Sequence, residues 1–232
     1  MSLKGGFRGN RVYLVVAIFV IMVIVLAVLF SGTELFPAYV PYDDTLEGWS
    51  EDIEERGGGS QLFGFESWCS FTYRNNNSSY PAYITVTTMK RFFMMNENEL
   101  KARTRETIIE KASEQNIAID TKTGISAERT LKNGHNTIYV VYNGNYNASE
   151  NISEKVKFIG ETWNCEKSST SIICIGYAQV TDNAHNNSEL NLKYWAKIIG
   201  DKYGNFAEEY KSTGFYNDFI DSAGLIFNVK CH

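Results

Sequence analysis

The side chains best suited to chemistry in this sequence are four cysteines and three histidines. They are Cys69, Cys165, Cys174 and Cys231, with His135, His185 and His232. No two cysteines stand in a CxxC spacing, so neither a zinc motif nor a thiol-exchange motif has support in the pattern. Cys231 and His232 are metal-ligand types, but a pair at a chain terminus is usually accidental. We therefore expect no metal site and no cofactor.

An even number of cysteines favours disulfide bonds, which form in oxidising compartments. Two of the cysteines flank a predicted hairpin whose loop runs from Glu166 to Ser171, so we expect a bond between Cys165 and Cys174 across its strands. Cys69 would then pair with Cys231. The alternative is that some of the four are free, buried thiols, because only some cross-strand positions suit disulfide geometry.

A continuous apolar segment runs from Val12 to Phe30. As an α-helix it would measure about 28 Å, close to the thickness of the hydrocarbon core of a bilayer. The apolar segment is preceded by Lys4, Arg8 and Arg11, with no acidic residue among them. After the segment, every charged residue before Arg56 is acidic. The positive-inside rule then predicts a cytoplasmic N-terminus and a C-terminal domain outside the cell membrane.

A cleaved secretory signal and a buried core helix are the alternatives for this segment. The apolar stretch is longer than that of a signal peptide, and Leu29 or Phe30 would occupy a position that usually holds a small residue. A helix that is apolar on every face would need a whole domain around it. We therefore expect an uncleaved signal anchor. The predicted divisions are a basic cytoplasmic tail at 1–11, a transmembrane anchor at 12–30, an acidic juxtamembrane stalk at 31–60 and an extracytoplasmic α/β domain at 61–232.

The composition indicates that the part of the chain after Phe30 is folded and acidic. The formal net charge is -5 although the residues up to Phe30 carry only cations, so the remainder is more acidic than the whole. Such a charge argues against nucleic acid as a partner. With 14% aromatic residues and only 3 prolines, the chain does not resemble a disordered protein.

The stalk contains a segment with helical periodicity from Asp43 to Arg56. Leu46, Trp49 and Ile53 would form an apolar stripe on this short acidic helix. The stripe is a candidate docking surface for a membrane partner, and the alternative is that the helix packs on its own domain.

Glycosylation sequons lie in segments that we predict to be loops, which permits surface glycosylation without establishing it. They are at Asn76, Asn77, Asn147, Asn151 and Asn186.

Alternating and helical periodicities predict an antiparallel sheet with helices. The predicted strands are 63–73, 82–89, 127–132, 136–146, 156–165 and 172–180, and the predicted helices are 97–115, capped by Asn96, and a later one between Asn186 and Gly200. Asn133-Gly134 favours a two-residue type I′ turn. We therefore expect an α+β fold, in which an N-terminal transmembrane helix precedes a mainly antiparallel sheet covered by helices on both faces.

This order of elements resembles that of the PsbP-like family, named for an extrinsic subunit of the photosystem II oxygen-evolving complex. The resemblance covers roughly residues 61–200 and lies in YPAYITV, ELKARTRETIIEKA, LKNG before IYVVYNG, and CIGYAQV. It implies an α/β/α domain and brings no invariant site. The anchor and the cysteines depart from the photosystem subunit, so a photosynthetic function is not carried over.

The sequence contains no GxSxG, P-loop, HExxH or GxGxxG motif. We therefore expect a membrane-anchored, extracytoplasmic accessory or assembly domain that binds a partner protein or membrane complex without catalysis. The alternative is a small-ligand-binding or sensor module, which a deep pocket with convergent polar groups would favour. A third hypothesis is an envelope enzyme. A carboxylate or histidine with a shifted pKa in such a pocket would favour it.

Overall fold

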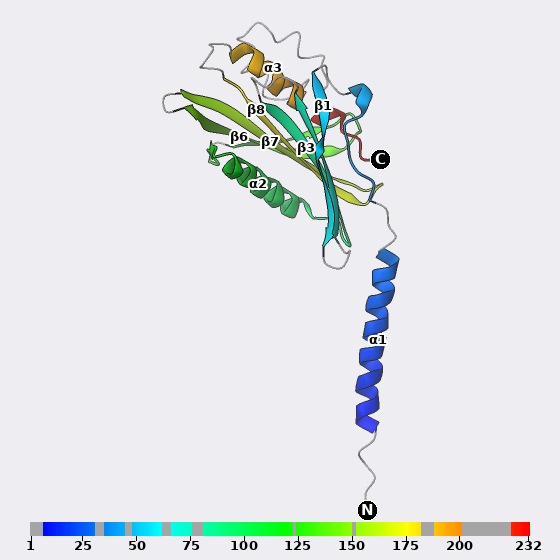
Figure 1. Ribbon diagram of the computed structural model, residues 1–232. Helices are drawn as coiled ribbons and strands as arrows, with labels where there is room; N and C mark the ends of the chain where they lie inside the picture. Colours follow the sequence, from blue (N-terminus) through cyan, green and yellow to red (C-terminus); the bar gives the residue numbers. More distant parts are fainter. Residues whose placement is uncertain are drawn as a thin grey trace, which may run out of the picture.

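The computed structural model describes residues 7–30, 35–44, 48–61, 66–75, 81–122, 124–149, 152–181, 188–200 and 224–232. Its main feature is an eight-stranded sheet with the order β1-β2-β3-β8-β7-β6-β4, in which β5 also pairs with β6 (Figure 1). All neighbouring strands are antiparallel. The strands are β1 (Trp49–Gln61), β2 (Glu66–Asn75), β3 (Ala82–Arg91), β4 (Ala118–Ile119), β5 (Ile125–Thr130), β6 (Asn136–Ser149), β7 (Ile152–Cys165) and β8 (Thr170–Gln179). The helices are α1 (Phe7–Phe30), α2 (Glu97–Glu114) and α3 (Ser188–Ile199), with the 3₁₀ helices η1 (Tyr42–Asp44) and η3 (Ile226–Asn228).

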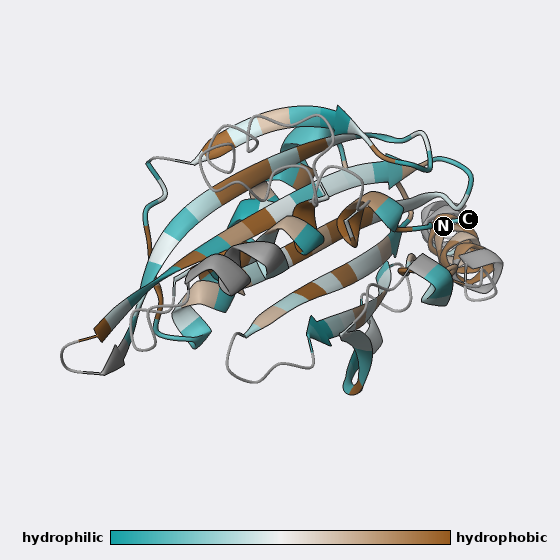
Figure 2. Ribbon diagram, turned by 90° about the horizontal axis from the view of Figure 1, so that it is seen from above, coloured by the Kyte–Doolittle hydropathy of each residue, from teal (hydrophilic) through white to brown (hydrophobic). Residues whose placement is uncertain are grey.

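Strand β8 lies in the middle of the sheet and is buried on both of its faces. Successive side chains of a strand point to opposite faces. Accordingly, Ile172 and Cys174 belong to one apolar cluster, whereas Ile173 and Ile175 belong to a second one on the other face. Hydrophobic residues, drawn in brown, run along the middle strands in Figure 2.

Two helices pack against the sheet from opposite sides (Figure 1). Glycines in the strands allow this close approach, because a side chain at either position would meet a helix. A Cβ atom at Gly160 of β7 would lie 2.8 Å from Ile108 Cδ1 of α2. A Cβ atom at Gly176 of β8 would lie 2.6 Å from Ile198 Cγ2 of α3.

The predicted fold class is wrong in its helical part. The structure is mostly antiparallel sheet with few helices, and the helices do not cover its faces. α2 contacts mainly β7 and β8, and α3 contacts mainly β8 and β3. The reason is one of length, because the 14 residues of β6 or β7 span about 46 Å whereas the 18 residues of α2 span about 27 Å.

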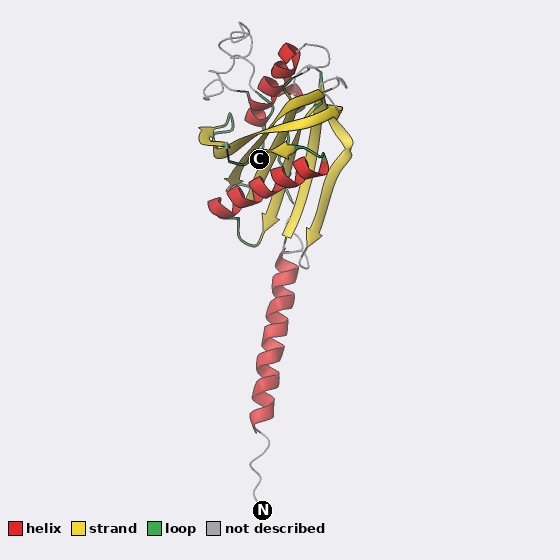
Figure 3. Ribbon diagram, turned by 90° about the vertical axis from the view of Figure 1, so that its left-hand side faces the viewer, coloured by secondary structure: helices red, strands yellow, loops and turns green. Residues whose placement is uncertain are grey.

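The predicted membrane anchor is also contradicted. α1 forms a continuous helix that projects away from the sheet (Figure 3). No helix in the described ranges is long and apolar enough to span a membrane. The prediction of a single-pass anchor, with the location derived from it, is therefore not retained.

The predicted stalk helix at Asp43–Arg56 is wrong as well. Its second half forms the edge strand β1, which pairs with β2 in antiparallel register. Hydrogen bonding to a neighbouring strand overrides the weak helical periodicity of an acidic segment. The expected type I′ turn is corrected too: Gly134 has φ +85°, but Asn133 is not among the residues with positive φ. The five residues 131–135 therefore form a longer turn with glycine in its left-handed position.

The C-terminal segment is held against the core by an isolated bridge. Tyr39 N donates to Lys230 O at 2.9 Å, and Lys230 N donates to Tyr39 O at 2.8 Å. Leu225, Ile226 and Val229 are fully buried in the same apolar cluster as α3. This packing fixes the place of the last residues of the chain.

Candidate functional site

Four side chains that could ligate a metal ion converge beside the C-terminus. One ligand atom from each of His135, Cys165, Cys231 and His232 lies within 4.8 Å of all the others. His135 precedes β6 in the turn after β5, Cys165 ends β7, and the remaining pair closes the chain. The fold therefore joins residues that are as far apart in the sequence as His135 and His232.

The contacts within this Cys-His cluster are short. Cys231 Sγ lies 2.7 Å from Cys165 Sγ and 3.2 Å from His135 Nε2. His232 Nδ1 lies 3.3 Å from Cys165 Sγ and 3.4 Å from Cys231 Sγ. The two cysteines are buried, whereas His135 is partly exposed and His232 is exposed. The cluster thus has its sulfur atoms inside and its imidazoles toward solvent.

The side chain of Asn133 positions two parts of the cluster at once. Its Oδ1 accepts a hydrogen bond from His135 N at 3.0 Å, and its Nδ2 donates one to Val229 O at 2.9 Å. Leu131 N also donates to His135 O at 2.9 Å. One amide group therefore links the histidine turn to the segment that leads to Cys231.

The surroundings of the cluster favour the neutral forms of His135 and Cys231. Burial lowers the pKa of His135 below its ordinary value, and the neighbouring His232 and Lys167 lower it further. Burial, together with the hydrogen bond to Cys165, raises the pKa of the Cys231 thiol. Lys167 Nζ lies 3.2 Å from His232 Nε2, at the solvent side.

The two expected disulfide bonds are not formed, and all four cysteines are free. In the hairpin of β7 and β8, Cys165 pairs with Thr170, and Cys174 pairs with Glu161. The loop is shorter than predicted, so the register differs by four residues from one that would place Cys165 beside Cys174. Cys69 on β2 lies opposite Thr88 on β3, whereas Cys231 contacts Cys165.

A second candidate surface is the loop between β3 and α2, which we call the aromatic loop and define as Phe92, Phe93 and Met94. All three side chains are exposed, and that of Phe93 is 77% exposed. They line a shallow groove of about 430 Å³. The other lining residues are Glu66, Arg91, Asn96 and Glu99. The surface thus combines apolar side chains with a charged rim.

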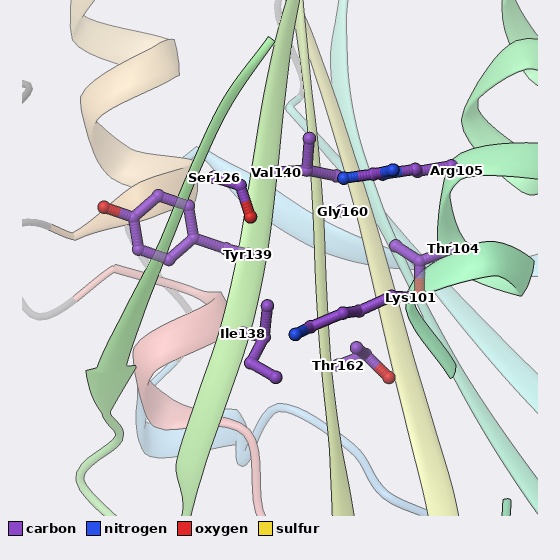
Figure 4. A pocket seen from close by; sticks show the side chains of 9 residues that line it. All are labelled: Lys101, Thr104, Arg105, Ser126, Ile138, Tyr139, Val140, Gly160 and Thr162. Carbon is purple, nitrogen blue, oxygen red and sulfur yellow. The ribbon is translucent and has the colours of Figure 1, made fainter. Parts of the chain in front are cut away.

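A small cavity lies between α2 and the strands β5, β6 and β7 (Figure 4). Lys101 and Arg105 extend from α2 toward Ile138 and Val140 of β6, and Gly160 and Thr162 of β7 also line the cavity. Its volume is about 10 Å³. That is room for about one water molecule, so this cavity does not suit a small organic ligand.

The residues of the predicted docking stripe are not brought together on one helical face. Trp49 is buried, with 5% of its surface exposed, whereas Ile53 on the same strand is 69% exposed. Leu46 lies outside the described residues. Trp49 therefore contributes to the core and is not available to a partner.

Among the predicted glycosylation sites, Asn147 is exposed and lies near the end of strand β6, not in a loop. The other candidates lie outside the described residues, as does one histidine; these are Asn76, Asn77, Asn151, Asn186 and His185.

Sequence reasoning considered Cys231 with His232 but did not connect them to His135 and Cys165. No sequence motif with a characteristic spacing includes all of these residues. The turn signal at Asn133-Gly134 indicated only the turn that holds His135. Comparison of the chain with protein-family models, curated proteins and solved structures finds no match. The resemblance to PsbP-like domains therefore stays a prediction.

Proposed function

We propose that the protein is a non-catalytic accessory domain that binds a partner protein through its aromatic loop. The observation that carries this proposal is the exposure of three adjacent large apolar side chains, Phe92, Phe93 and Met94, beside a groove. Contiguous apolar surface of this kind is typical of interaction sites. Aromatic side chains also supply much of the binding free energy at protein interfaces.

The residue after the loop is fixed to the sheet. Met95 is buried, its N donates to Ser171 Oγ at 3.3 Å, and its O accepts from Asn164 Nδ2 at 2.8 Å. Asn96 then caps α2 by accepting a hydrogen bond from Glu99 N at 3.0 Å. A firmly held neighbour reduces the ordering that binding would require of the loop.

The loop also has internal order and a charged border. The rings of Phe92 and Phe93 pack edge to face with centroids 4.5 Å apart. Arg91 Nε lies 2.9 Å from Glu66 Oε2, and Arg91 also pairs with Glu99 at the start of α2. An apolar centre with a polar rim is the usual anatomy of a protein interface. The partner surface is therefore expected to present an apolar pocket or ridge.

The test compares two exposed substitutions, Phe93→Ala in the loop and Ile53→Ala on β1. The full-length protein is immobilised, and bound proteins are recovered from an extract of the source cells and quantified. We expect a stoichiometric partner whose binding weakens at least about 10-fold with Phe93→Ala, since loss of a central aromatic costs about 1–3 kcal/mol or more. Ile53→Ala should bind as the unchanged protein does, and neither substitution should alter the melting temperature. Equal recovery with both variants would overturn the proposal.

A further inference from the structure

We propose that His135, Cys165, Cys231 and His232 form a binding site for a divalent transition-metal ion of the zinc type. The proposal is independent of the aromatic loop. It rests on the convergence of four ligand atoms from three separate segments of the chain.

The donor set selects the class of ion. Two thiolates and two imidazoles are the ligands that zinc prefers in four-coordinate structural sites. Calcium and magnesium instead take oxygen ligands, and the cluster contains no carboxylate. Thiolates and imidazoles are soft or borderline donors, which also admit cobalt as a spectroscopic substitute for zinc.

The distances within the cluster are close to those of a tetrahedral site. With metal–sulfur bonds of about 2.3 Å and metal–nitrogen bonds of about 2.0 Å, tetrahedral angles place sulfur and nitrogen about 3.5 Å apart. The contacts of His135 Nε2 and His232 Nδ1 with the cysteines are 3.2, 3.3 and 3.4 Å. These contacts need little adjustment.

The two sulfur atoms must separate when an ion enters. Two thiolates on one tetrahedral ion lie about 3.8 Å apart, whereas Cys165 Sγ and Cys231 Sγ are 2.7 Å apart. Binding therefore releases the thiol protons and moves the sulfur atoms apart by about 1 Å.

Residues around the cluster supply support of the kind found at metal centres, where outer groups orient the ligands. Asn133 holds the turn that contains His135 and also bonds to Val229 ahead of Cys231. Lys167 is different, because its ammonium group lies beside His232 Nε2 and offers no lone pair while charged. Lys167 is therefore a neighbour of the site and not a ligand.

A disulfide between Cys165 and Cys231 is the competing use of the same sulfur atoms. Its formation would remove two protons and two electrons from the thiols, which an oxidant such as dissolved oxygen or a peroxide would accept. The bond would eliminate both thiolate ligands. The two states are therefore mutually exclusive and can be distinguished chemically.

The test uses the full-length protein, reduced and freed of metal by a chelator, with thiol content measured before titration. Cobalt(II) is added, and the visible and near-ultraviolet bands of tetrahedral, thiolate-ligated cobalt are followed. Zinc is then added to displace the cobalt. We expect one ion per chain, loss of the cobalt bands on addition of zinc, and a higher melting temperature in the presence of zinc.

The variants are chosen at exposed positions so that folding is preserved. His232→Ala should weaken cobalt binding at least about 10-fold, since one of four ligands is lost, whereas Ile53→Ala, on the edge strand β1 and not part of the cluster, should retain full affinity. Circular dichroism checks that both are folded. Absence of tetrahedral bands in fully reduced protein, or equal affinity of His232→Ala and the unchanged protein, would overturn the proposal. Recovery of the protein from its source with Cys165 and Cys231 joined in a disulfide and without metal would overturn it too.

Discussion

The guanidinium of Arg129 forms a buried ion pair with the carboxylate of Glu161, with Arg129 Nε 2.9 Å from Glu161 Oε1. The side chain of Glu161 is 0% exposed and that of Arg129 is 13% exposed. Arg129 Nη1 also donates to Ile199 O at 2.7 Å, at the last residue of α3. Thr137 donates a further hydrogen bond to Glu161. The pair therefore ties β5 and β7 to the end of a helix.

Removing one member of this pair should destabilise the fold strongly. Glu161→Gln leaves the Arg129 charge in the interior without its counterion, and such a loss costs about 3–5 kcal/mol. The free energy of unfolding is measured by urea denaturation, followed by circular dichroism. Glu128→Gln, on the same sheet at an exposed position, is the control and should change stability little. A loss below about 1 kcal/mol for Glu161→Gln would contradict the burial of the pair.

A side chain at Gly160 should push α2 away from the sheet. The added Cβ would overlap Thr104 Cγ2 and approach Ile108 Cδ1, and both neighbours are buried on α2. Overpacking of this kind costs about 1–3 kcal/mol, so Gly160→Ala should lower the melting temperature by several degrees. Gly58→Ala is the matched strand control, because its Cβ would lie 3.4 Å from the nearest atom, Trp68 O. Equal melting of the two variants would show that α2 adjusts freely.

Local signals in the sequence were sufficient where the structure is also local. The helix at Glu97–Glu114 begins after Asn96 as expected, since its cap and its buried stripe lie within the same few turns. Strand β8 was predicted at 172–180; it carries apolar residues on both faces, as central strands do, and lies between β3 and β7. By contrast, β1 was predicted as helix because its acidic, glycine-rich residues carry little strand signal, and only pairing with β2 defines it.

The candidate metal site could not be predicted because it depends on register and on chain packing. A hairpin slip of four residues keeps every side chain on its expected face, so periodicity does not reveal it. That slip places Cys174 beside Glu161 and leaves Cys165 at the strand end. The bridge between Tyr39 and Lys230 then carries Cys231 to the same place. Neither contact has a signature in the sequence.

Alkaline pH should destabilise the protein through its buried tyrosines. Burial raises the pKa of Tyr73 and of Tyr83 to about 12, above the ordinary value of about 10. Below about pH 10 both groups are neutral in the folded and unfolded states, so their contribution to stability is fully present. Above that pH the unfolded chain ionises first, and stability falls as pH rises through about 12.

The check is the pH dependence of urea unfolding for the unchanged protein and for Tyr83→Phe. The variant loses the hydrogen bond from Gln115 Nε2 to the Tyr83 hydroxyl, which costs about 0.5–1.5 kcal/mol at neutral pH. It should nevertheless lose less stability than the unchanged protein between about pH 10 and 12. Parallel curves for the two proteins would contradict ionisation of Tyr83 as a cause.

Trp49→Ala separates a core role from a docking role for the residue first considered as part of a partner-binding stripe. Trp49 is buried in the cluster beneath α3, and its ring lies edge-on to Tyr194 with centroids 6.5 Å apart. Truncating a buried tryptophan costs about 3–5 kcal/mol, so the melting temperature should fall by roughly 6 to 20 degrees in a domain of this size. Differential scanning calorimetry measures the fall.

The control for Trp49→Ala is Ile53→Ala, because Ile53 lies on the same strand with its side chain in solvent. Its melting temperature should match that of the unchanged protein. Partner recovery by Trp49→Ala should decrease only in proportion to the folded fraction, since the tryptophan does not reach the surface. A normal melting temperature combined with a loss of partner binding would show that Trp49 leaves the core to contact the partner, and would refute the packing described for β1.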